Sequence, residues 1–350
     1  MDLENKEWRE FVIGEIFDDI VNSKAYHKNN LNTHINNPIP YVTRTKYNNG
    51  LESIVENSDL EQNPKNTIVF GAESVTFFYE PFEYITGNKM YYIIDKHFNK
   101  HICLFLVNVL NNLVKNNFGY SRGLTGSRLK KQKIMLPINE NKLPDYDFME
   151  EYMIKQYNYQ LNIIKENLKL KLETLNYKPV PQLDEIKWKE FSLTNIGTIK
   201  SGKDITKKDM INGKTPYVSS TANNNGISAY INNNNETLEG HCISINRNGS
   251  VGYAFYHPYS ALFSNDCRKL TTEHNANKYI SLFIVNQIKA QKDKYNYGYK
   301  MGTNRLEKQK IMLPIDANGN PNYEYMEQYM INLEINTLTQ YKKYIENMYS

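Results

Sequence analysis

Short runs of hydrophobic residues, separated by Asn, Gly and Pro, fill most of the chain. Runs such as Phe11-Val12-Ile13, Thr67-Ile68-Val69-Phe70, Met90 to Ile94 and His241 to Ile245 predict strands. Two longer apolar blocks, Ile102 to Val114 and Ile280 to Ile288, predict helices. Each block is followed by a glycine-containing loop, a basic turn and one last strand. We expect these last strands at Ile134 to Pro137 and at Ile311 to Pro314.

A long amphipathic pattern ends each half of the chain. Apolar residues recur every three or four positions at Met153, Tyr157, Leu161, Ile164, Leu168, Leu172 and Leu175, and again at Met330, Leu338, Tyr341, Ile345 and Tyr349. Such a seam is typical of helix-on-helix packing. A helix over residues 149–176 would be ~42 Å long. Because neither half offers another long helix, we expect the two helices to pack on each other as an antiparallel pair. The alternative is that each helix lies on its own half.

The chain is an internal repeat. Four blocks recur in order with an offset of 176 to 180 residues. Trp8-Arg9-Glu10-Phe11 recurs as Trp188-Lys189-Glu190-Phe191, and the segments Tyr41-Val42-Thr43 and Asn48-Asn49-Gly50 recur as Tyr217-Val218-Ser219 and Asn224-Asn225-Gly226. The apolar helical blocks also recur, and Arg128-Leu129 and Lys131 to Ile138 recur as Arg305-Leu306 and Lys308 to Ile315. A period this long indicates duplicated domains and not a solenoid of short repeats.

These patterns predict an α+β protein of two tandem domains. We expect each domain to be a small mixed sheet or partial barrel with helices, and the two long helices to join them as an antiparallel coiled coil. The expected boundaries are 1–148 for the first domain, 149–180 for the first long helix and linker, 181–325 for the second domain, and 326–350 for the second long helix. Pro179 and Pro181 are expected to end the first helix.

Composition narrows the class of protein. The chain has 350 residues and a net charge of +4, and because residues 1–180 are neutral, the whole surplus lies in residues 181–350. Cys103, Cys242 and Cys267 are too far apart for a zinc ribbon or a disulfide framework. The charged start of the chain does not resemble a signal peptide, and the apolar run Ile102 to Val107 is too short to cross a bilayer. We therefore expect a cytoplasmic protein without membrane contact.

No catalytic constellation is visible in the sequence. Gly213-Lys214-Thr215 resembles part of a phosphate loop, but Lys208 stands where that motif needs Gly. His97 and His101 have metal-ligand spacing without the Glu of a zincin, and the second half has Ala276 and Ile280 near those places, so a surface histidine pair is the preferred interpretation. No Asn-Pro-Pro-Tyr, Asp-Pro-Pro-Tyr or Gly-x-Gly-x-x-Gly run is present, so we expect no catalytic centre, cofactor or metal in this chain.

Four features that each occur twice together resemble the specificity (S) subunit of restriction-modification systems: the Trp-x-x-Phe opening, the Tyr-Val-(Thr/Ser)…Asn-Asn-Gly block, the Gly-Tyr…Arg-Leu-x-Lys-Gln-Lys-Ile-Met-Leu-Pro-Ile block and the trailing long helix. The resemblance covers nearly the whole chain in both copies, and it is closest to BcgI-like (Type IIB) systems, with Type I S subunits as neighbours. It implies a target-recognition domain in each half, each gripping one part of a bipartite double-stranded DNA site. It also implies methyltransferase or fused endonuclease-methyltransferase partners that carry S-adenosylmethionine and Mg²⁺. The two helices would then set the number of unread base pairs.

Candidate DNA-binding residues lie mainly where the two copies differ, because two half-sites usually differ. They are Arg44, Lys46, Tyr47, Asn48, Glu73, Ser74, Asn88, Lys89, Arg122 and Ser127 in the first copy, and Lys203, Lys207, Ser220, Asn223, Arg247, Asn248, Ser250, Asn265, Arg268, Lys300, Thr303 and Asn304 in the second. The shared Arg128 and Arg305 are assigned to phosphate contact or loop structure, and Lys131, Lys133, Lys308 and Lys310 to phosphate. The alternative for each is an ordinary solvated loop side chain.

Two other functions remain open from the sequence. The chain could be a protein-binding decoy that occupies a methyltransferase without reading DNA, or a self-contained nuclease. A nuclease is disfavoured because no paired acidic-lysine motif recurs in both copies.

Overall fold

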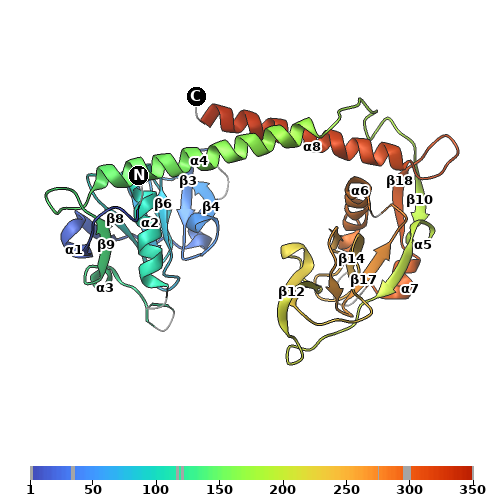
Figure 1. The fold of residues 1–350 in the computed structure, drawn as a ribbon, viewed down its shortest axis with the longest axis horizontal. Coiled ribbons are helices and arrows are strands. Elements are labelled where there is room, and N and C mark those ends of the chain that lie inside the picture. Colours follow the sequence, from blue (N-terminus) through green and yellow to red (C-terminus); the bar gives the residue numbers. More distant parts are fainter. Residues whose placement is uncertain are drawn as a thin grey trace. The chain divides into compact units, whose positions relative to one another are not determined.

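The computed structural model describes residues 3–32, 36–115, 118–119, 122–274, 276–294 and 301–348. It divides into two compact units, Met1–Ile164 and Lys165–Ser350, coloured from blue to green and from green to red in Figure 1. The boundary falls inside the long helix α4 (Tyr146–Glu173). The second unit therefore contains the end of this helix, the linker and the second repeat.

The first unit builds two open sheets and a separate strand pair. Its elements are β1 (Trp8–Val12), α1 (Ile13–Ile16), β2 (Asp19–Asn22), β3 (Pro38–Val42), β4 (Leu51–Glu56), β5 (Thr67–Gly71), β6 (Phe77–Glu80), β7 (Ile85–Thr86), β8 (Met90–Ile94), α2 (Lys100–Val114), α3 (Gly126–Leu129), β9 (Lys133–Pro137) and the start of α4. The strand orders are β2-β8-β5-β6, β4-β3-β7 and β1-β9. Only β3 and β7 run parallel among these neighbours.

The second unit repeats this topology. Its elements are β10 (Trp188–Ser192), α5 (Leu193–Ile196), β11 (Thr198–Ser201), β12 (Asn212–Val218), β13 (Ile227–Ile231), β14 (Cys242–Asn246), β15 (Ala254–His257), β16 (Leu262–Phe263), β17 (Cys267–Thr271), α6 (Lys278–Lys289), α7 (Thr303–Glu307), β18 (Lys310–Pro314) and α8 (Tyr323–Met348). The strand orders are β11-β17-β14-β15, β13-β12-β16 and β10-β18. The expected pair of like domains with mixed sheets is confirmed, and the sheets are open.

The first and last blocks of each repeat pair with each other. Trp8 stands opposite Pro137 in the antiparallel ladder of β1 and β9, and Trp188 stands opposite Pro314 in that of β10 and β18. Each indole Nε1 also donates a hydrogen bond to a backbone carbonyl five residues earlier, 3.1 Å in the first unit and 2.8 Å in the second. The pairing explains why a Trp-x-x-Phe opening and an Ile-Met-Leu-Pro strand recur together in the sequence.

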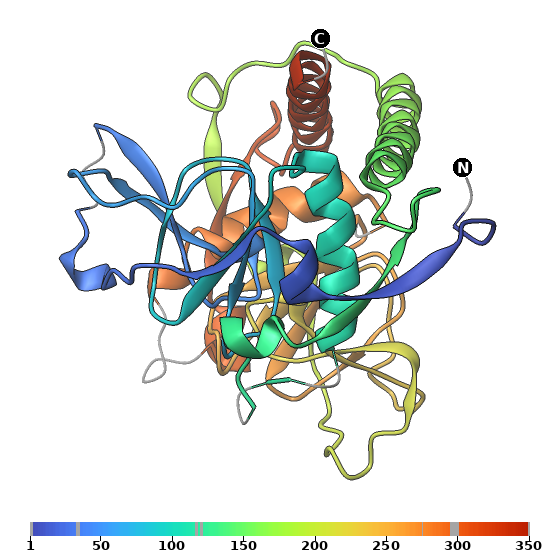
Figure 2. The ribbon, with the colours of Figure 1, turned by 90° about the vertical axis from the view of Figure 1, so that its left-hand side faces the viewer.

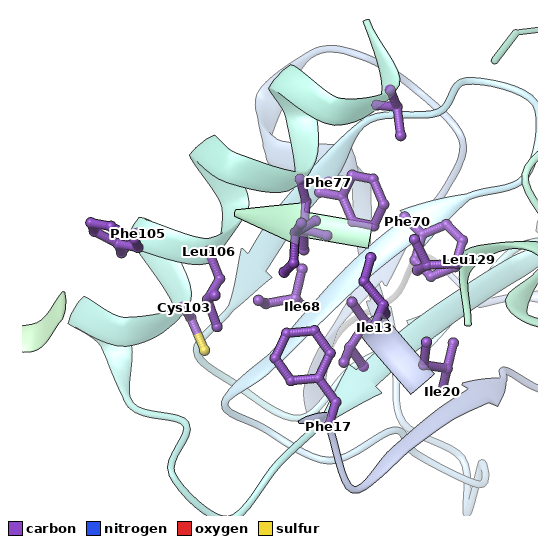
Figure 3. Close-up of a cluster of buried hydrophobic side chains, with 14 of the residues drawn as sticks. Ile13, Phe17, Ile20, Ile68, Phe70, Phe77, Cys103, Phe105, Leu106 and Leu129 are labelled. Carbon is purple, nitrogen blue, oxygen red and sulfur yellow. The ribbon is translucent and has the colours of Figure 1, made fainter. Parts of the chain in front are cut away.

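A hydrophobic core lies between the four-stranded sheet and α2 in the first unit. Figure 2 shows α2 along one side of the strands, and Figure 3 shows Leu106 of this helix on the side of Ile68, Phe70 and Phe77, whereas Phe105 points away from them. The strand β5 is buried throughout. The side chain of Asn99 caps α2 by accepting hydrogen bonds from two backbone N–H groups, and Asn277 does the same for α6.

The long helices begin three residues earlier than expected and dock first on their own units. Met149 and Met326 are fully buried in the two cores. Tyr152 of α4 meets Phe105 of α2 edge to face at 6.0 Å, and Tyr329 of α8 meets Phe283 of α6 in the same way at 6.2 Å. Packing between the two long helices therefore does not account for their first turns, which follow the alternative and pack on their own units.

Beyond these turns the two helices carry exposed apolar residues. Ile164, expected in the seam, is 37% exposed, whereas Leu168 is buried. Within the second unit, Lys171 near the end of α4 lies 3.7 Å from Glu334 of α8. Pairing of the helices over their full length would join the two units and stays a prediction.

The linker after α4 is tied to α8. The Tyr325 hydroxyl donates to the carbonyl of Pro181 at 2.9 Å, and the Gln328 amide donates to the carbonyl of Asn176 at 2.9 Å. The Asn332 amide donates to the carbonyl of Lys178 at 2.6 Å. These three side chains lie on one face of α8, so the linker is held along the helix by hydrogen bonds from these side chains to its backbone carbonyls.

Equivalent positions of β6 and β15 carry buried ionisable groups. Glu80 is 8% exposed, its Oε1 has no hydrogen-bond partner among the described residues, and burial raises its pKa to about 8. His257 is fully buried, shares a hydrogen bond of 2.8 Å with the Ser244 hydroxyl, and burial lowers its pKa to about 4. Both groups are therefore uncharged in the folded protein at neutral pH.

The Glu80 carboxyl should make the stability of the first unit depend on pH. Its pKa is raised in the folded state, so the folded state is favoured while the carboxyl is protonated. This stabilisation is complete below the unfolded-state pKa of 4.5 and is lost as pH rises to about 8. Over that window the free energy of unfolding should fall by about 1.4 kcal/mol per pH unit, and Glu80→Gln should remove the slope. Urea unfolding followed by Trp8 fluorescence in a Trp188→Phe background measures this. Equal slopes in the two proteins would refute the assignment.

The strand pair should contribute strongly to the stability of the first unit. Leu136 is fully buried on β9, whereas its neighbour Met135 is 49% exposed. We expect Leu136→Ala to cost about 2–5 kcal/mol and Met135→Ala at most about 0.5 kcal/mol. The same Trp8 unfolding measurement compares the two. Similar losses for both variants would contradict the inward orientation of Leu136.

Candidate nucleic-acid interface

A polar cleft opens in the first unit where the turns after β3, β5 and β7 meet the end of α2. Its volume is about 1120 Å³. Five residues expected from the sequence to contact DNA line it: Arg44, Lys46, Glu73, Ser74 and Asn88. The structure therefore gathers candidates from three separate turns into one concave surface.

One carboxylate connects these turns. The two oxygens of Glu73 bind Arg44 Nη1 and Lys89 Nζ, the latter at 2.5 Å. Arg44 lies against Gly71, where an added Cβ would come within 2.6 Å of the arginine Cγ. A larger residue at Gly71 would displace Arg44. The position of the guanidinium is thus fixed by one ion pair and one close backbone approach.

The second unit carries a groove of about 480 Å³ lined by Arg247, Arg268, Gly302, Thr303, Asn304 and Arg305. Arg268 is 4% exposed. Its Nε donates to the Thr303 hydroxyl at 2.7 Å, and its Nη1 donates to the carbonyls of Asn265 and Cys267 at 2.8 and 2.9 Å. Burial lowers the pKa of Arg268, and the neighbouring positive charge of Arg247 lowers it further.

Asp266 interacts with Arg247, which lines this groove. Its Oδ1 accepts a hydrogen bond from Asn248 Nδ2 at 2.9 Å and lies 4.0 Å from Arg247 Nη2. The backbone carbonyl of Asp266 also accepts from the Arg247 N–H at 2.9 Å. The turn after β14 and the start of β17 are therefore bound to each other by side chain and backbone together.

Strand register shows which positions correspond in the two units. Gly71 stands opposite Met90, and Asn246 stands opposite Cys267. It follows that Glu73 and Lys89 of the first unit occupy the places of Asn248 and Asp266 in the second. The side chains contact each other in both units, but the charges differ: a carboxylate meets an ammonium in one, and an amide meets a carboxylate in the other.

The next pair differs in the same way. Phe70 stands opposite Tyr91, and Ile245 stands opposite Arg268. Tyr91 packs against Gly126, where an added Cβ would lie 3.2 Å from its ring, whereas Arg268 bonds to Thr303. Gly126 leaves room for the ring of Tyr91, and Thr303 supplies a hydrogen-bond acceptor for Arg268. This coupling between residues 35 positions apart was not visible in the sequence.

The Asn-Asn-Gly blocks have a structural explanation. Asn48, Asn49 and Gly50 have φ of 51°, 52° and 81°, and Asn224, Asn225 and Gly226 have φ of 49°, 54° and 77°. Asn and Gly tolerate this left-handed backbone best, so the turn selects them. Tyr47 beside the first turn is 79% exposed. Asn48 and Asn223 are exposed as well, and their DNA contacts stay predictions.

Several candidate cations lie outside the two concave surfaces and have partners. Arg128 donates to the carbonyl of Gly123 at 2.6 Å, and Arg122 lies 5.3 Å from the centre of the Phe118 ring. Ion pairs within 3.0 Å join Lys133 to Glu10, Lys310 to Glu190 and Lys203 to Glu236. Lys131, Lys207 and Lys308 are exposed. Lys300 lies outside the described residues.

The remaining polar candidates take part in turns. The hydroxyls of Ser127 and Thr125 are 3.1 Å apart. The Ser250 N–H donates to the carbonyl of Ser220 at 3.1 Å, and the Asn265 N–H donates to Asp204 Oδ1 at 2.8 Å. The first of these contacts lies at the start of α3 in the first unit, and the other two lie in turns of the second unit.

The structure gives two features of the sequence a different role from the one that the sequence suggested. The residue equivalent to His97 is His274, not Ala276: each imidazole packs on the first tyrosine of a long helix, at 4.4 Å from Tyr146 and 3.8 Å from Tyr323. Gly213-Lys214-Thr215 lies within strand β12 and not in a loop, so it cannot wrap a phosphate. Among the described residues, no three His, Cys, Asp or Glu side chains are grouped as metal ligands.

Comparison with known proteins agrees with this architecture. The family model of the type I restriction-modification DNA specificity domain matches residues 5–173 and again residues 185–347. The chain belongs to this family. Each match covers one repeat together with its long helix. The resemblance noted from the four sequence blocks is confirmed.

Two known proteins match this chain over nearly its full length. The chain is 35% identical over 328 residues to the specificity subunit of the BcgI type II restriction enzyme from Heyndrickxia coagulans, and the match covers 93% of this chain and 94% of the relative. The crystal structure of a type I S subunit from M. genitalium matches 99% of this chain and 94% of its own length, with 18% identity and a TM-score of 0.56. That structure shows the same fold.

The chain is thus a specificity subunit of restriction-modification systems with two tandem recognition domains. Members of this family are generally not catalytic themselves. Within the part of the chain that is described, no helix combines the length and the apolar character needed to cross a bilayer.

The Arg268–Thr303 hydrogen bond should stabilise the second recognition domain. Thr303→Val keeps the shape of the side chain but leaves the buried Nε–H without its acceptor, which should cost about 1–3 kcal/mol. Thr303→Ser keeps the hydroxyl and should cost less. Unfolding followed by Trp188 fluorescence in a Trp8→Phe background compares them. Equal stability of the Val and Ser variants would show that the bond contributes nothing.

Proposed function

We propose that this specificity subunit reads a bipartite double-stranded DNA target, with one half-site for each recognition domain. The observation that carries the proposal is one concave polar surface in each domain, to which the equivalent turns after β5 and β14 both contribute. Both surfaces combine arginine with amide or carboxylate side chains. Such groups match the donors and acceptors on base edges in the major groove.

The different chemistry of the two surfaces supports two different half-sites. In the first domain, Glu73 places a hydrogen-bond acceptor between two cations. A carboxylate accepts from the amino group of cytosine, and a neighbouring arginine suits guanine. In the second domain, the equivalent position holds Asn248, whose amide donates to Asp266 beside the groove instead of lining it.

The long helices would set the distance between the half-sites. At about 1.5 Å per residue, α4 with 28 residues is ~42 Å long and α8 with 26 residues is ~39 Å long. Each is docked on its own domain by buried first-turn residues. A fixed separation between two readers selects a fixed number of unread base pairs.

Catalysis would come from partner subunits. A methyltransferase, or a fused endonuclease-methyltransferase, would carry S-adenosylmethionine and Mg²⁺ and bind this chain through the long helices, which expose Ile154, Tyr159, Leu333, Tyr341 and Tyr344. The complex would act on DNA in the cytoplasm.

Glu73→Gln tests the reading role of the first cleft. In the complex with partner subunits, loss of the bridging charge should relax methylation at one position of one half-site, by about 5- to 150-fold in discrimination. The second half-site should stay unchanged. Single-molecule methylome sequencing measures both halves of the motif at once.

Glu61→Gln is the matched control, because Glu61 forms an exposed ion pair with Lys24 in the same domain but does not line the cleft. It should leave the motif unchanged. Exchange of a whole recognition domain for that of a relative should change one half-site. A methylation pattern that ignores the exchanged domain would overturn the proposed function.

A further inference from the structure

Arg268 is a buried cation without a counter-ion. No carboxylate among the described residues lies within 4.0 Å of its guanidinium, and its hydrogen bonds go to a hydroxyl and two carbonyls, all uncharged. Removing a charge from water is costly unless an opposite charge compensates it. The groove that Arg268 lines is open to solvent, so a ligand that enters it can supply the negative charge that Arg268 lacks.

The surroundings of Arg268 add positive charge instead of removing it. Arg247 and Arg305 line the same groove, and Arg247 is close enough to depress the ionisation of Arg268. The carboxylate of Asp266 is 44% exposed, stands 4.0 Å from Arg247 and shares its Oδ1 with Asn248. Arg247 and Arg268 together thus face one partly solvated carboxylate, which leaves a net positive charge beside the groove.

We infer that this groove, formed by Arg247, Arg268 and Arg305, is a seat for one backbone phosphate of the DNA, and it rests on the proposed function. A phosphodiester has two charged oxygens that accept from several guanidinium groups at once. A guanine edge offers two neutral acceptors to one arginine and would bring no negative charge to Arg268. The missing counter-charge of Arg268 therefore favours the phosphate.

The first domain has no equivalent seat. Tyr91, Ala72 and Gly126 stand at the places of Arg268, Arg247 and Thr303, and Tyr91 fills the space beside Gly126. Only Arg128, at the place of Arg305, is shared, and it donates to the carbonyl of Gly123. The second domain thus has a phosphate seat of this kind that the first domain lacks, in line with the net charge of +4 in residues 181–350.

The test uses the full chain assembled with its partner subunits and a duplex that carries the methylated motif. Arg247→Gln should weaken binding of the cognate duplex and of a duplex mutated in the second half-site by the same factor. The slope of log affinity against log salt should fall by about 1. In the wild-type complex, one uncharged methylphosphonate near the second half-site should reproduce the loss, and it should add nothing in the variant.

Lys214→Gln is the matched control, because it removes an exposed positive charge from the same domain outside the groove. Arg247→Lys keeps the charge and should retain most of the affinity and the salt slope. Trp188 fluorescence unfolding verifies that the variants fold. If Arg247→Gln lost affinity only for one base position, Arg247→Lys did not restore it and the salt slope did not change, Arg247 would be assigned to base reading. That result would overturn the inference.

Failure of the inference differs from failure of the proposed function. If the wild-type complex binds its site and Arg247→Gln behaves like Lys214→Gln, the phosphate seat is refuted while the reading function stands. If the wild-type complex shows no site-dependent binding, the proposed function is refuted and the inference with it.

Discussion

Each recognition domain depends on one pairing between segments far apart in the chain: β1 with β9 and β10 with β18. The ladder from Trp8 to Val12 against Lys133 to Pro137 brings the two ends of the domain together. The long helix α4 begins at Tyr146, soon after β9 ends at Pro137, so the pairing also restricts where that helix starts. His97 packs on Tyr146, and Phe105 of α2 packs on Tyr152, which fixes the first turns of α4. Without the ladder, the two ends of the domain would not meet and the helix would have no defined direction.

The repeat made most of this architecture predictable. Two domains, their last strands and their apolar helices follow from blocks that recur at a nearly constant offset, and burial of Leu136 and Leu313 follows from the pattern of the last strands. The short helices α3 and α7 and the aromatic docking of the long helices did not follow. They depend on contacts such as Phe283 with Tyr329, which lie 46 positions apart and give no local periodicity.

The candidate sites were predictable as residue types but not as assemblies. Arg44, Glu73 and Lys89 stood out because they differ from the second copy, yet their common carboxylate required the turns to meet in space. Arg268 appeared as one loop cation among many. Its burial comes from strand register opposite Ile245 and from the hydroxyl of Thr303, neither of which the sequence displays. The comparison of His97 with Ala276 failed for the same reason, since loop lengths shift the offset between copies.

A common scaffold with exchangeable turns separates stability from specificity. The buried strands β5 and β14 hold the turns in the same place in both domains, and the side chains at the equivalent positions pair with each other whatever their charge. Glu73 with Lys89 and Asn248 with Asp266 satisfy the same geometric constraint with different hydrogen-bonding groups. Because the pairing is local, a change of both partners alters the polar groups at these turns while the core is untouched. The two domains thereby share one fold and still carry different side-chain chemistry at equivalent positions.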